Sequence, residues 1–281
     1  MDYRQSQSQF CKWQLKGVIR SHLLSQIGLK TVNQAQTRNL AMDGRDWLIA
    51  VNLVTIAGVT RGFSGFGSAM ILAPGLSLLF NPQQVVATVI LLEMTASVGL
   101  IPTALSKTKW KKVFPMVLTA LVMIPIGSYF LVLLDPVLMR RIIGGLILIF
   151  VVLLLFGKHI IFKPRIVLSL GIGACSGFLT GLTGMGGPPV VLYEFSGKGT
   201  SSTNRANLIS FFALTQFFAL ISYWLQGILS FLVIQRFLIL LVPFLFSLFL
   251  GNFLFKRVSE LIFKKIVLGI LVIIGFVAIS L

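Results

Sequence analysis

The sequence predicts an all-α, multi-pass membrane protein made of two homologous, inverted halves. About eight long transmembrane helices and two short half-helices after glycine-rich breaks are expected. Three observations predict this fold. Apolar residues make up 56% of the 281 residues and charged residues only 11%, whereas a soluble domain carries about 25% charged residues. Long apolar runs alternate with short polar breaks. A glycine-rich motif occurs twice, 119 residues apart.

The charge distribution excludes several classes of protein. Lys and Arg number 24 against 7 Asp and Glu, giving a net charge of +17. The basic residues cluster between apolar runs, as in the loops of membrane proteins. No nucleic-acid partner is expected, because recognition helices, RNA-binding strands and Cys/His finger spacings are lacking. Cys11 and Cys175 are too far apart in sequence to suggest a disulfide framework, and no clustered metal-ligand spacing is present.

Residues 1–46 form a basic N-terminal tail that differs from the rest of the chain. Three interpretations remain open. The tail is an interfacial helix on an anionic membrane, a targeting segment, or a disordered extension ahead of an alternative start at Met42.

The long helices follow from the length of each apolar run, since about 20 residues cross a bilayer at about 1.5 Å per residue. The first repeat covers 47–157 and the second covers 166–281. The expected long helices are 47–62, 84–105, 113–134, 141–157, 166–183, 204–226, 231–255 and 262–281. The pieces 69–80 and 188–196 are too short to cross a core of about 30 Å. Trp110, Trp224 and Tyr223 are expected to be interfacial anchors.

The repeated motif is the most informative feature. Gly62–Ser68 (GFSGFGS) and Gly181–Gly187 (GLTGMGG) share the pattern G-x-[ST]-G-x-G. If each short piece turns back, each half makes five passes, and the basic loops 106–112, 158–165, 198–205 and 256–265 share the cytoplasmic side. An odd number of passes makes the halves inverted, a common transporter plan. In the alternative, each broken segment crosses once, giving eight passes.

The breaks suit an anion. Short helices that start at Ser68 and Pro188 would present their amide N–H groups near the middle of the membrane, where they attract negative charge. The Ser68 hydroxyl is expected to cap its helix, and Pro188 suits the first helical position. The alternative is close helix packing through small residues. Backbone breaks inside a membrane are tolerated where protein or a wet cavity surrounds them.

Few charged residues lie at membrane depth, where ionisable groups are expensive and usually functional. A guanidinium such as that of Arg205 can hold two oxygens of an oxyanion. The alternatives are a cytoplasmic boundary position for Arg205 and Glu194, paired with each other, an interhelical brace for Glu93, and helix–helix contacts for Thr215 and Gln216. The expected substrate-binding residues are Gly65, Gly67, Ser68, Gly184, Gly186, Gly187, Asn204, Arg205 and Asn207. The expected coupling or pathway residues are Arg61, Glu93, Glu194, Thr215 and Gln216.

These motifs resemble those of the sulfite exporter TauE/SafE family. The matching segments are Gly62–Pro74 (GFSGFGSAMILAP), Gly181–Tyr193 (GLTGMGGPPVVLY) and Asn204–Leu208. The resemblance covers about 47–281 and excludes the tail. It implies a plasma-membrane permease that exports sulfite, sulfonates or related small organic anions, with its substrate region at the two breaks and at Asn204–Asn207. Members with different substrates look alike at these motifs, so the substrate stays open.

We therefore expect a permease that moves a small anion by alternating access. The alternatives are an anion channel, or a membrane-embedded enzyme or scaffold without transport. An enzyme is not expected, because the spans contain no His and their few carboxylates have no matching partners. An ATP-driven pump is not expected either, because no G-x-x-x-x-G-K-[ST] loop is present. The expected partners are the anion and the lipid bilayer, with no cofactor and no metal, and the oligomeric state is open.

Overall fold

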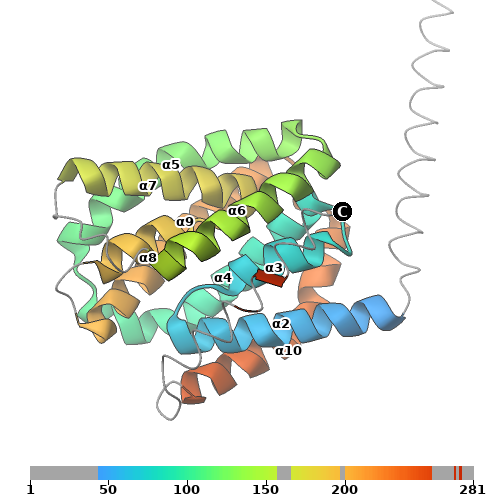
Figure 1. The fold of residues 1–281 in the computed structure, drawn as a ribbon, viewed down its shortest axis with the longest axis horizontal. Coiled ribbons are helices and arrows are strands. Elements are labelled where there is room, and N and C mark those ends of the chain that lie inside the picture. The colour runs from blue at the N-terminus through green and yellow to red at the C-terminus, as the bar shows by residue number, and fades with distance from the viewer. Residues whose placement is uncertain (1–43, 157–165, 197–199, 255–268, 270–271, 274–281) are drawn as a thin grey trace, which may run out of the picture. The chain divides into compact units, whose positions relative to one another are not determined.

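The computed structural model describes residues 44–156, 166–196, 200–254, 269 and 272–273 of the chain. Within these residues all regular structure is helical (Figure 1). The long helices are α2 Gly44–Ser64, α4 Pro82–Ala104, α5 Trp110–Leu133, α6 Pro136–Phe156, α7 Ile166–Thr183, α9 Ser201–Leu225 and α10 Phe231–Leu254. The short helices are α3 Ser68–Ser77 and α8 Gly187–Phe195, and a 3₁₀ turn, η1, covers Leu105–Lys107.

Seven helices of the described part are long and apolar enough to cross a membrane. They match seven of the predicted long helices, and both predicted short pieces are present, so the all-α, multi-pass prediction is confirmed for the described residues. The eighth predicted helix, 262–281, lies outside the described residues apart from positions 269, 272 and 273. Of the predicted tail 1–46, residues 1–43 lie outside the described residues, and 44–46 belong to α2. The division into 1–46, 47–157 and 166–281 stays a prediction.

The helix boundaries repeat along the chain. Three pairs of equivalent boundaries are each 119 residues apart, which is the displacement of the glycine motif. These pairs are the ends of α2 and α7 at Ser64 and Thr183, the starts of α3 and α8 at Ser68 and Gly187, and the starts of α4 and α9 at Pro82 and Ser201. The duplicated sequence therefore forms the same succession of a long helix, a break, a short helix and a long helix in both halves.

The two breaks begin with the same turn, at the second glycine of the motif. Gly65 and Gly184 have φ angles of 79° and 73°, in the left-handed region that glycine adopts without penalty because it lacks a Cβ. Their amide groups donate hydrogen bonds to the carbonyl oxygens of Arg61 at 2.8 Å and Thr180 at 2.9 Å. The second glycine of the motif thus ends the long helix.

The hydroxyl residue of the motif supports this turn. Ser64 Oγ accepts a hydrogen bond from the Phe66 amide at 3.3 Å. Thr183 Oγ1 accepts one from the Met185 amide at 3.2 Å. A short hydroxyl side chain can hold a turn in this way because it reaches the backbone two residues ahead. The pattern G-x-[ST]-G-x-G therefore encodes a specific backbone turn rather than a mere accumulation of small residues.

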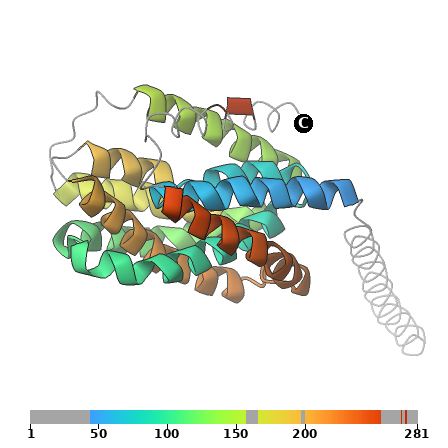
Figure 2. The same ribbon diagram turned by 90° about the horizontal axis from the view of Figure 1, so that it is seen from below.

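The long helix before each break packs on a long helix of the other half. Gly62 of α2 lies so close to α10 that a Cβ would collide with the carbonyl oxygen of Leu248. Gly181 of α7 lies in the same way on Ile124 of α5. Small residues permit such close approach of two backbones. The pairs α2–α10 and α5–α7 run side by side in both views (Figures 1 and 2), so the two halves are intertwined.

Successive contacts give the direction of α2. Gly58 approaches Phe244 and, one turn later, Gly62 approaches Leu248, so α2 and α10 run in the same direction. By the same argument α7 runs parallel to α5, because Gly177 approaches Ala120 before Gly181 approaches the following turn of α5.

Each short helix then turns back along the next long helix. Ser68, the first residue of α3, bonds to Glu93 in the middle of α4. Gly187, the first residue of α8, approaches Phe212 in the middle of α9. Because the chain then enters α4 or α9 from its first residue, each short helix starts near the middle of the bundle and runs antiparallel to its long neighbour toward one end.

Candidate functional site

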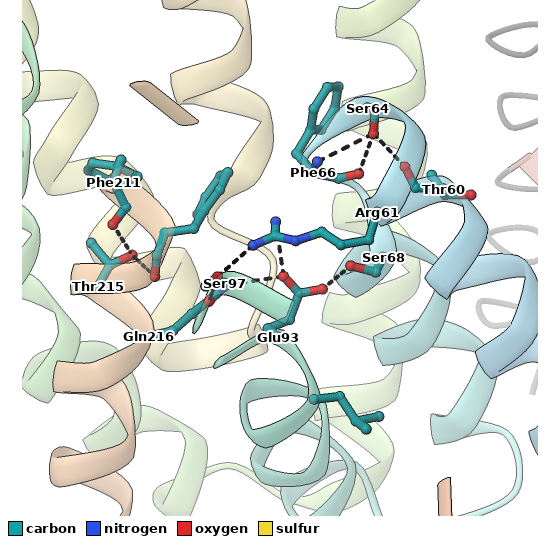
Figure 3. A network of polar contacts seen from close by, with 12 residues as sticks. Thr60, Arg61, Ser64, Phe66, Ser68, Glu93, Ser97, Phe211, Thr215 and Gln216 are labelled. Atoms are coloured by element: carbon teal, nitrogen blue, oxygen red, sulfur yellow. Dashed lines mark hydrogen bonds and ion pairs between the residues drawn. The ribbon is translucent and has the colours of Figure 1, made fainter. Parts of the chain in front are cut away.

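Five buried polar side chains form a cluster where the first break meets the middle of α4. We name Arg61, Ser68, Glu93, Ser97 and Gln216 the central polar cluster (Figure 3). They come from α2, α3, α4 and α9, and therefore from both halves. Arg61 is only 1% exposed, and its Nη1 lies 3.2 Å from Oε2 of Glu93. The helix that precedes the break thus carries a full positive charge into the bundle.

The Glu93 carboxylate is bonded on both oxygens. Ser68 donates its hydroxyl to Oε1, and Nε2 of Gln216 donates to Oε2 at 3.0 Å. Arg61 Nη2 donates to Ser97 Oγ at 2.7 Å, and Ser97 donates in turn to Oε1 of Gln216 at 2.7 Å. A buried ion pair needs such additional hydrogen bonds to offset the loss of hydration. The predicted brace function of Glu93 is therefore present in the geometry, together with the ion pair.

Arg61 also links the two breaks. Its guanidinium carbon lies 5.3 Å from the centroid of the Phe212 ring, and Gly187 of the second break lies against the same ring. Phe66 of the first break packs against the apolar cluster that contains Phe212. Arg61 Nε is buried and makes no hydrogen bond in the structure, so one donor remains available to a further acceptor.

Arg205 lies directly on the first break. Its stem packs against Gly65, where a Cβ would come within 2.9 Å of the arginine Cγ. Nη2 donates to the carbonyl oxygen of Gly62 at 2.9 Å and to Oδ1 of Asn252 at 3.1 Å. Arg205 and Arg61 therefore both lie at the first break, Arg61 in the last turn of α2 and Arg205 against Gly65. The glycine is required here because any larger residue would displace the arginine.

Asn204 and Asn207, which flank Arg205 in sequence, are both buried. Asn207 Nδ2 donates to Oε2 of Glu194 at 2.8 Å, and its Oδ1 accepts from the Lys109 amide at 2.8 Å. Lys112 Nζ lies 3.0 Å from the same Glu194 oxygen. These residues form a second polar group, at the outer end of α8 and away from the central polar cluster.

The second break has a different lining. Gly184 lies in ordinary contact with Val89 of α4. Gly186 is backed by α7, where a Cβ would collide with the hydroxyl of Thr180. Thr215 is fully buried and donates its hydroxyl to two carbonyl oxygens one turn back in its own helix. The structure therefore places Gly186 and Thr215 in close helix packing, and their part in binding or transport stays a prediction.

Two details of the predicted helix starts are wrong. The N-cap of α3 is Gly67, with a φ of 94°, and no side chain caps this helix. The Ser68 hydroxyl bonds to Glu93 instead, because a buried carboxylate is a strong acceptor. The short helix of the second half begins at Gly187, so Pro188 takes the second position. The remaining predicted site residues keep their assigned binding and pathway functions as predictions.

Tyr223 is not the interfacial anchor that its place near a span end suggested. The side chain is fully buried, and its hydroxyl lies 3.0 Å from the carbonyl oxygen of Thr180 and 2.9 Å from that of Gly181. Both carbonyls lie in the last turn of α7, and that of Thr180 also accepts a hydrogen bond from the Gly184 amide. The tyrosine hydroxyl therefore adds a donor at the end of the helix. Trp110 and Trp224, by contrast, are exposed, at 42% and 69%.

Sequence reasoning also missed Ser97, Lys112 and Arg236. Ser97 could have been found, because it is 119 residues from Gln216 and therefore its counterpart in the repeat. Arg236 is a charged residue within an apolar helix, which is itself a signal of function, and it is 4% exposed.

In the described part of the chain no three His, Cys, Asp or Glu residues gather to hold a metal ion.

Comparison with known proteins assigns the part of the chain that contains both glycine breaks to one family. The family model described as sulfite exporter TauE/SafE matches residues 50–278. The chain belongs to the TauE/SafE family. Searches of curated proteins and of solved structures find no match. The TauE/SafE match extends over both breaks, and together with seven apolar helices it makes the chain a multi-pass membrane protein of a transporter family.

Proposed function

We propose that this TauE/SafE protein is a permease that moves a small anion, such as sulfite, a sulfonate or a similar organic anion, across the plasma membrane. Export by alternating access is the proposed mode. The observation that carries the proposal is the pair of arginines at the first break: Arg61 is buried at the centre, and Arg205 packs on Gly65 of the glycine turn.

The charges around the first break favour an anion. Arg61 and Arg205 both bring a guanidinium to the first break, and Arg205 donates to the carbonyl oxygen of Gly62 and to Oδ1 of Asn252. The planar donors of arginine suit two oxygens of an oxyanion at once. The free Nε donor of Arg61 supplies a further bond.

An arriving anion would compete with Glu93 for Arg61. Ser68 and Gln216 would hold the Glu93 side chain in place through their hydrogen bonds while Arg61 turns to the anion. Exchange of Arg61 between Glu93 and the anion is the step that we propose for binding and release.

We further propose that the two halves are inverted with five passes each. The antiparallel course of α4 and α9 supports this arrangement, because Lys107, just after α4, contacts Ser202 at the start of α9. Eight single crossings would make α4 and α9 parallel. Short half-helices whose N-termini lie near the middle of the membrane are a common feature of transporter binding sites. The two breaks would then face opposite sides in turn.

The test is flux of radiolabelled sulfite into liposomes that contain the purified protein. Wild-type protein should give saturable uptake, and Arg205→Ala should abolish it. Arg141→Ala, which removes an exposed arginine, is the matched control and should keep wild-type flux. Saturable flux at transporter rates separates a permease from a channel, which would give currents far above them. The proposal fails if correctly folded protein moves neither sulfite nor any sulfonate tested.

A further inference from the structure

Arg236 is a buried cation near the start of α10. Its side chain is 4% exposed. Nη1 donates to Oε1 of Gln84, in the first turn of α4, at 2.8 Å, and the guanidinium carbon lies 4.2 Å from the centroid of the Phe80 ring. Both partners belong to the other half, so the charge is held within the bundle and not among lipid headgroups.

The repeat gives Arg236 a counterpart, Lys112, in α5. Gly127 of α5 and Gly251 of α10 make equivalent close contacts with the other half, and they are 124 residues apart. Lys112 and Arg236 have the same separation. Lys112 also stacks on an aromatic ring of the other half, with its Nζ 4.6 Å from the centroid of Tyr193. The two cations therefore occupy matching positions.

The two positions differ in their anion. Lys112 is paired with Glu194 at 3.0 Å, but the residue that corresponds to Glu194, 119 positions earlier, is Gly75. In the described ranges no carboxylate lies within ion-pair distance of Arg236, and its buried Nη2 makes no hydrogen bond. A buried charge without a counter-ion is strongly unfavourable, so the negative charge at this position is best supplied by a ligand.

We infer that Arg236 and Gln84 form an outer anion site, which binds an oxyanion through Arg236 Nη2. Gln84 fixes the guanidinium through Nη1 and leaves the second amino group for the ligand. The inference rests on the proposed function, because it makes the outer anion site a second binding site for the transported anion on its pathway. Gln84 and Glu93 are nine residues apart on α4, which separates this site from the central polar cluster by about 14 Å along the helix.

The test uses full-length protein in nanodiscs of zwitterionic phosphatidylcholine, titrated with sodium sulfite under nitrogen. Binding is followed with radiolabelled sulfite and thermal unfolding. Wild-type protein should bind two sulfite ions. Arg236→Gln should bind one, or bind the second at least tenfold more weakly, as expected for the loss of a hydrogen bond to a charged group. Arg141→Gln, an exposed arginine at the start of α6, is the matched control and should bind two.

Gln84→Glu is the decisive variant, because it supplies Arg236 with a carboxylate from the chain itself. It should raise the unfolding temperature in the absence of sulfite and remove the second sulfite ion. If this variant is stabilised while it still binds two sulfite ions with wild-type affinity, Arg236 is only structural and the inference is overturned. Binding of a single sulfite ion, or none, by the wild type overturns it as well.

A lipid phosphate has the same oxyanion chemistry, and a parallel series in phosphatidylglycerol nanodiscs separates the two sources. If anionic lipid stabilises the wild type but not Arg236→Gln, and sulfite stoichiometry is the same in both proteins, the ligand is a headgroup and the transported-anion assignment is overturned. Flux distinguishes this failure from failure of the proposed function. If Arg236→Gln keeps wild-type sulfite flux and binding, the proposal of an outer anion site is overturned and the proposed permease function stands. If the wild type binds two sulfite ions but shows no flux, the outer anion site is supported and the proposed permease function is overturned.

Discussion

Ser97 donates a hydrogen bond to Oε1 of Gln216 across 2.7 Å, and these two residues are counterparts in the repeat, 119 positions apart. When a two-fold axis relates two halves, corresponding residues can touch each other only close to that axis. The Arg61–Glu93 ion pair bonds to both of them. The Arg61–Glu93 ion pair therefore lies where the two halves contribute equivalent positions.

Removal of the Glu93 charge tests the ion pair. Glu93→Gln keeps the shape of the side chain but leaves Arg61 buried without a carboxylate, which costs about 3–5 kcal/mol for a pair broken on one side. We expect a markedly lower midpoint of thermal unfolding in detergent. The double variant Arg61→Gln/Glu93→Gln should recover much of the loss, because no buried charge then remains. A wild-type midpoint for Glu93→Gln would contradict the assignment.

Tyr223 is expected to stabilise the end of α7. Tyr223→Phe removes the hydroxyl that lies between the carbonyl oxygens of Thr180 and Gly181. Loss of the donor at the Gly181 carbonyl, the shorter of the two contacts, costs about 1–3 kcal/mol when the oxygen is buried, so the unfolding midpoint should fall. Tyr129→Phe is the matched control, since Tyr129 is 58% exposed and its replacement should change little. Equal midpoints for both variants would show that water replaces the hydroxyl at the break.

The glycines that join the two halves should be sensitive to a single methyl group. Gly62→Ala and Gly181→Ala would each push a Cβ into backbone of the other half, and both should lower the yield of folded protein and its unfolding midpoint. Gly99→Ala is the control, because nothing lies within 4 Å of its Cβ position. Alanine there should stabilise α4 by up to about 1 kcal/mol through its helix propensity. Tolerance of alanine at Gly62 and Gly181 would mean that the halves are less closely packed.

Cysteine labelling in intact cells tests the proposed five-pass halves. In a background without Cys11 and Cys175, Lys107→Cys and Ser202→Cys should both be protected from an impermeant maleimide. The two positions are exposed and their side chains are in contact. Arg141→Cys, at the other end of the helices, should be labelled from outside. Eight single crossings would instead place residues 107 and 202 on opposite sides, so labelling of only one of them would favour that arrangement.

The fold was predictable wherever local chemistry determines it. Apolar run length gives the long helices, and the spacing of the two motifs gives equivalent boundaries such as those at Ser64 and Thr183. The turn itself follows from a glycine with positive φ and a hydroxyl that holds the next amide. These interactions join residues that are close in sequence, so a single amino-acid sequence is enough to recognise them.

Partners in space were not predictable in the same way. Arg61, Glu93 and Gln216 each stood out as polar residues within apolar runs. Nothing in their spacing indicates that the Glu93 carboxylate forms an ion pair with Arg61 and accepts a hydrogen bond from Gln216. Tyr223 near a span end is indistinguishable by sequence from an interfacial anchor. Whether such a side chain points outward or onto a neighbouring helix depends on packing between segments far apart in the chain.

The reciprocal glycine contacts also bear on how the chain is made. During synthesis on the ribosome, α2 enters the membrane long before α10 has been translated, although its glycine face is shaped for α10 alone. Lipid or an insertion factor must cover that face until nearly the whole polypeptide has emerged. Neither half is therefore a natural folding unit, and truncated products that lack α10 should be targets for membrane quality-control proteases.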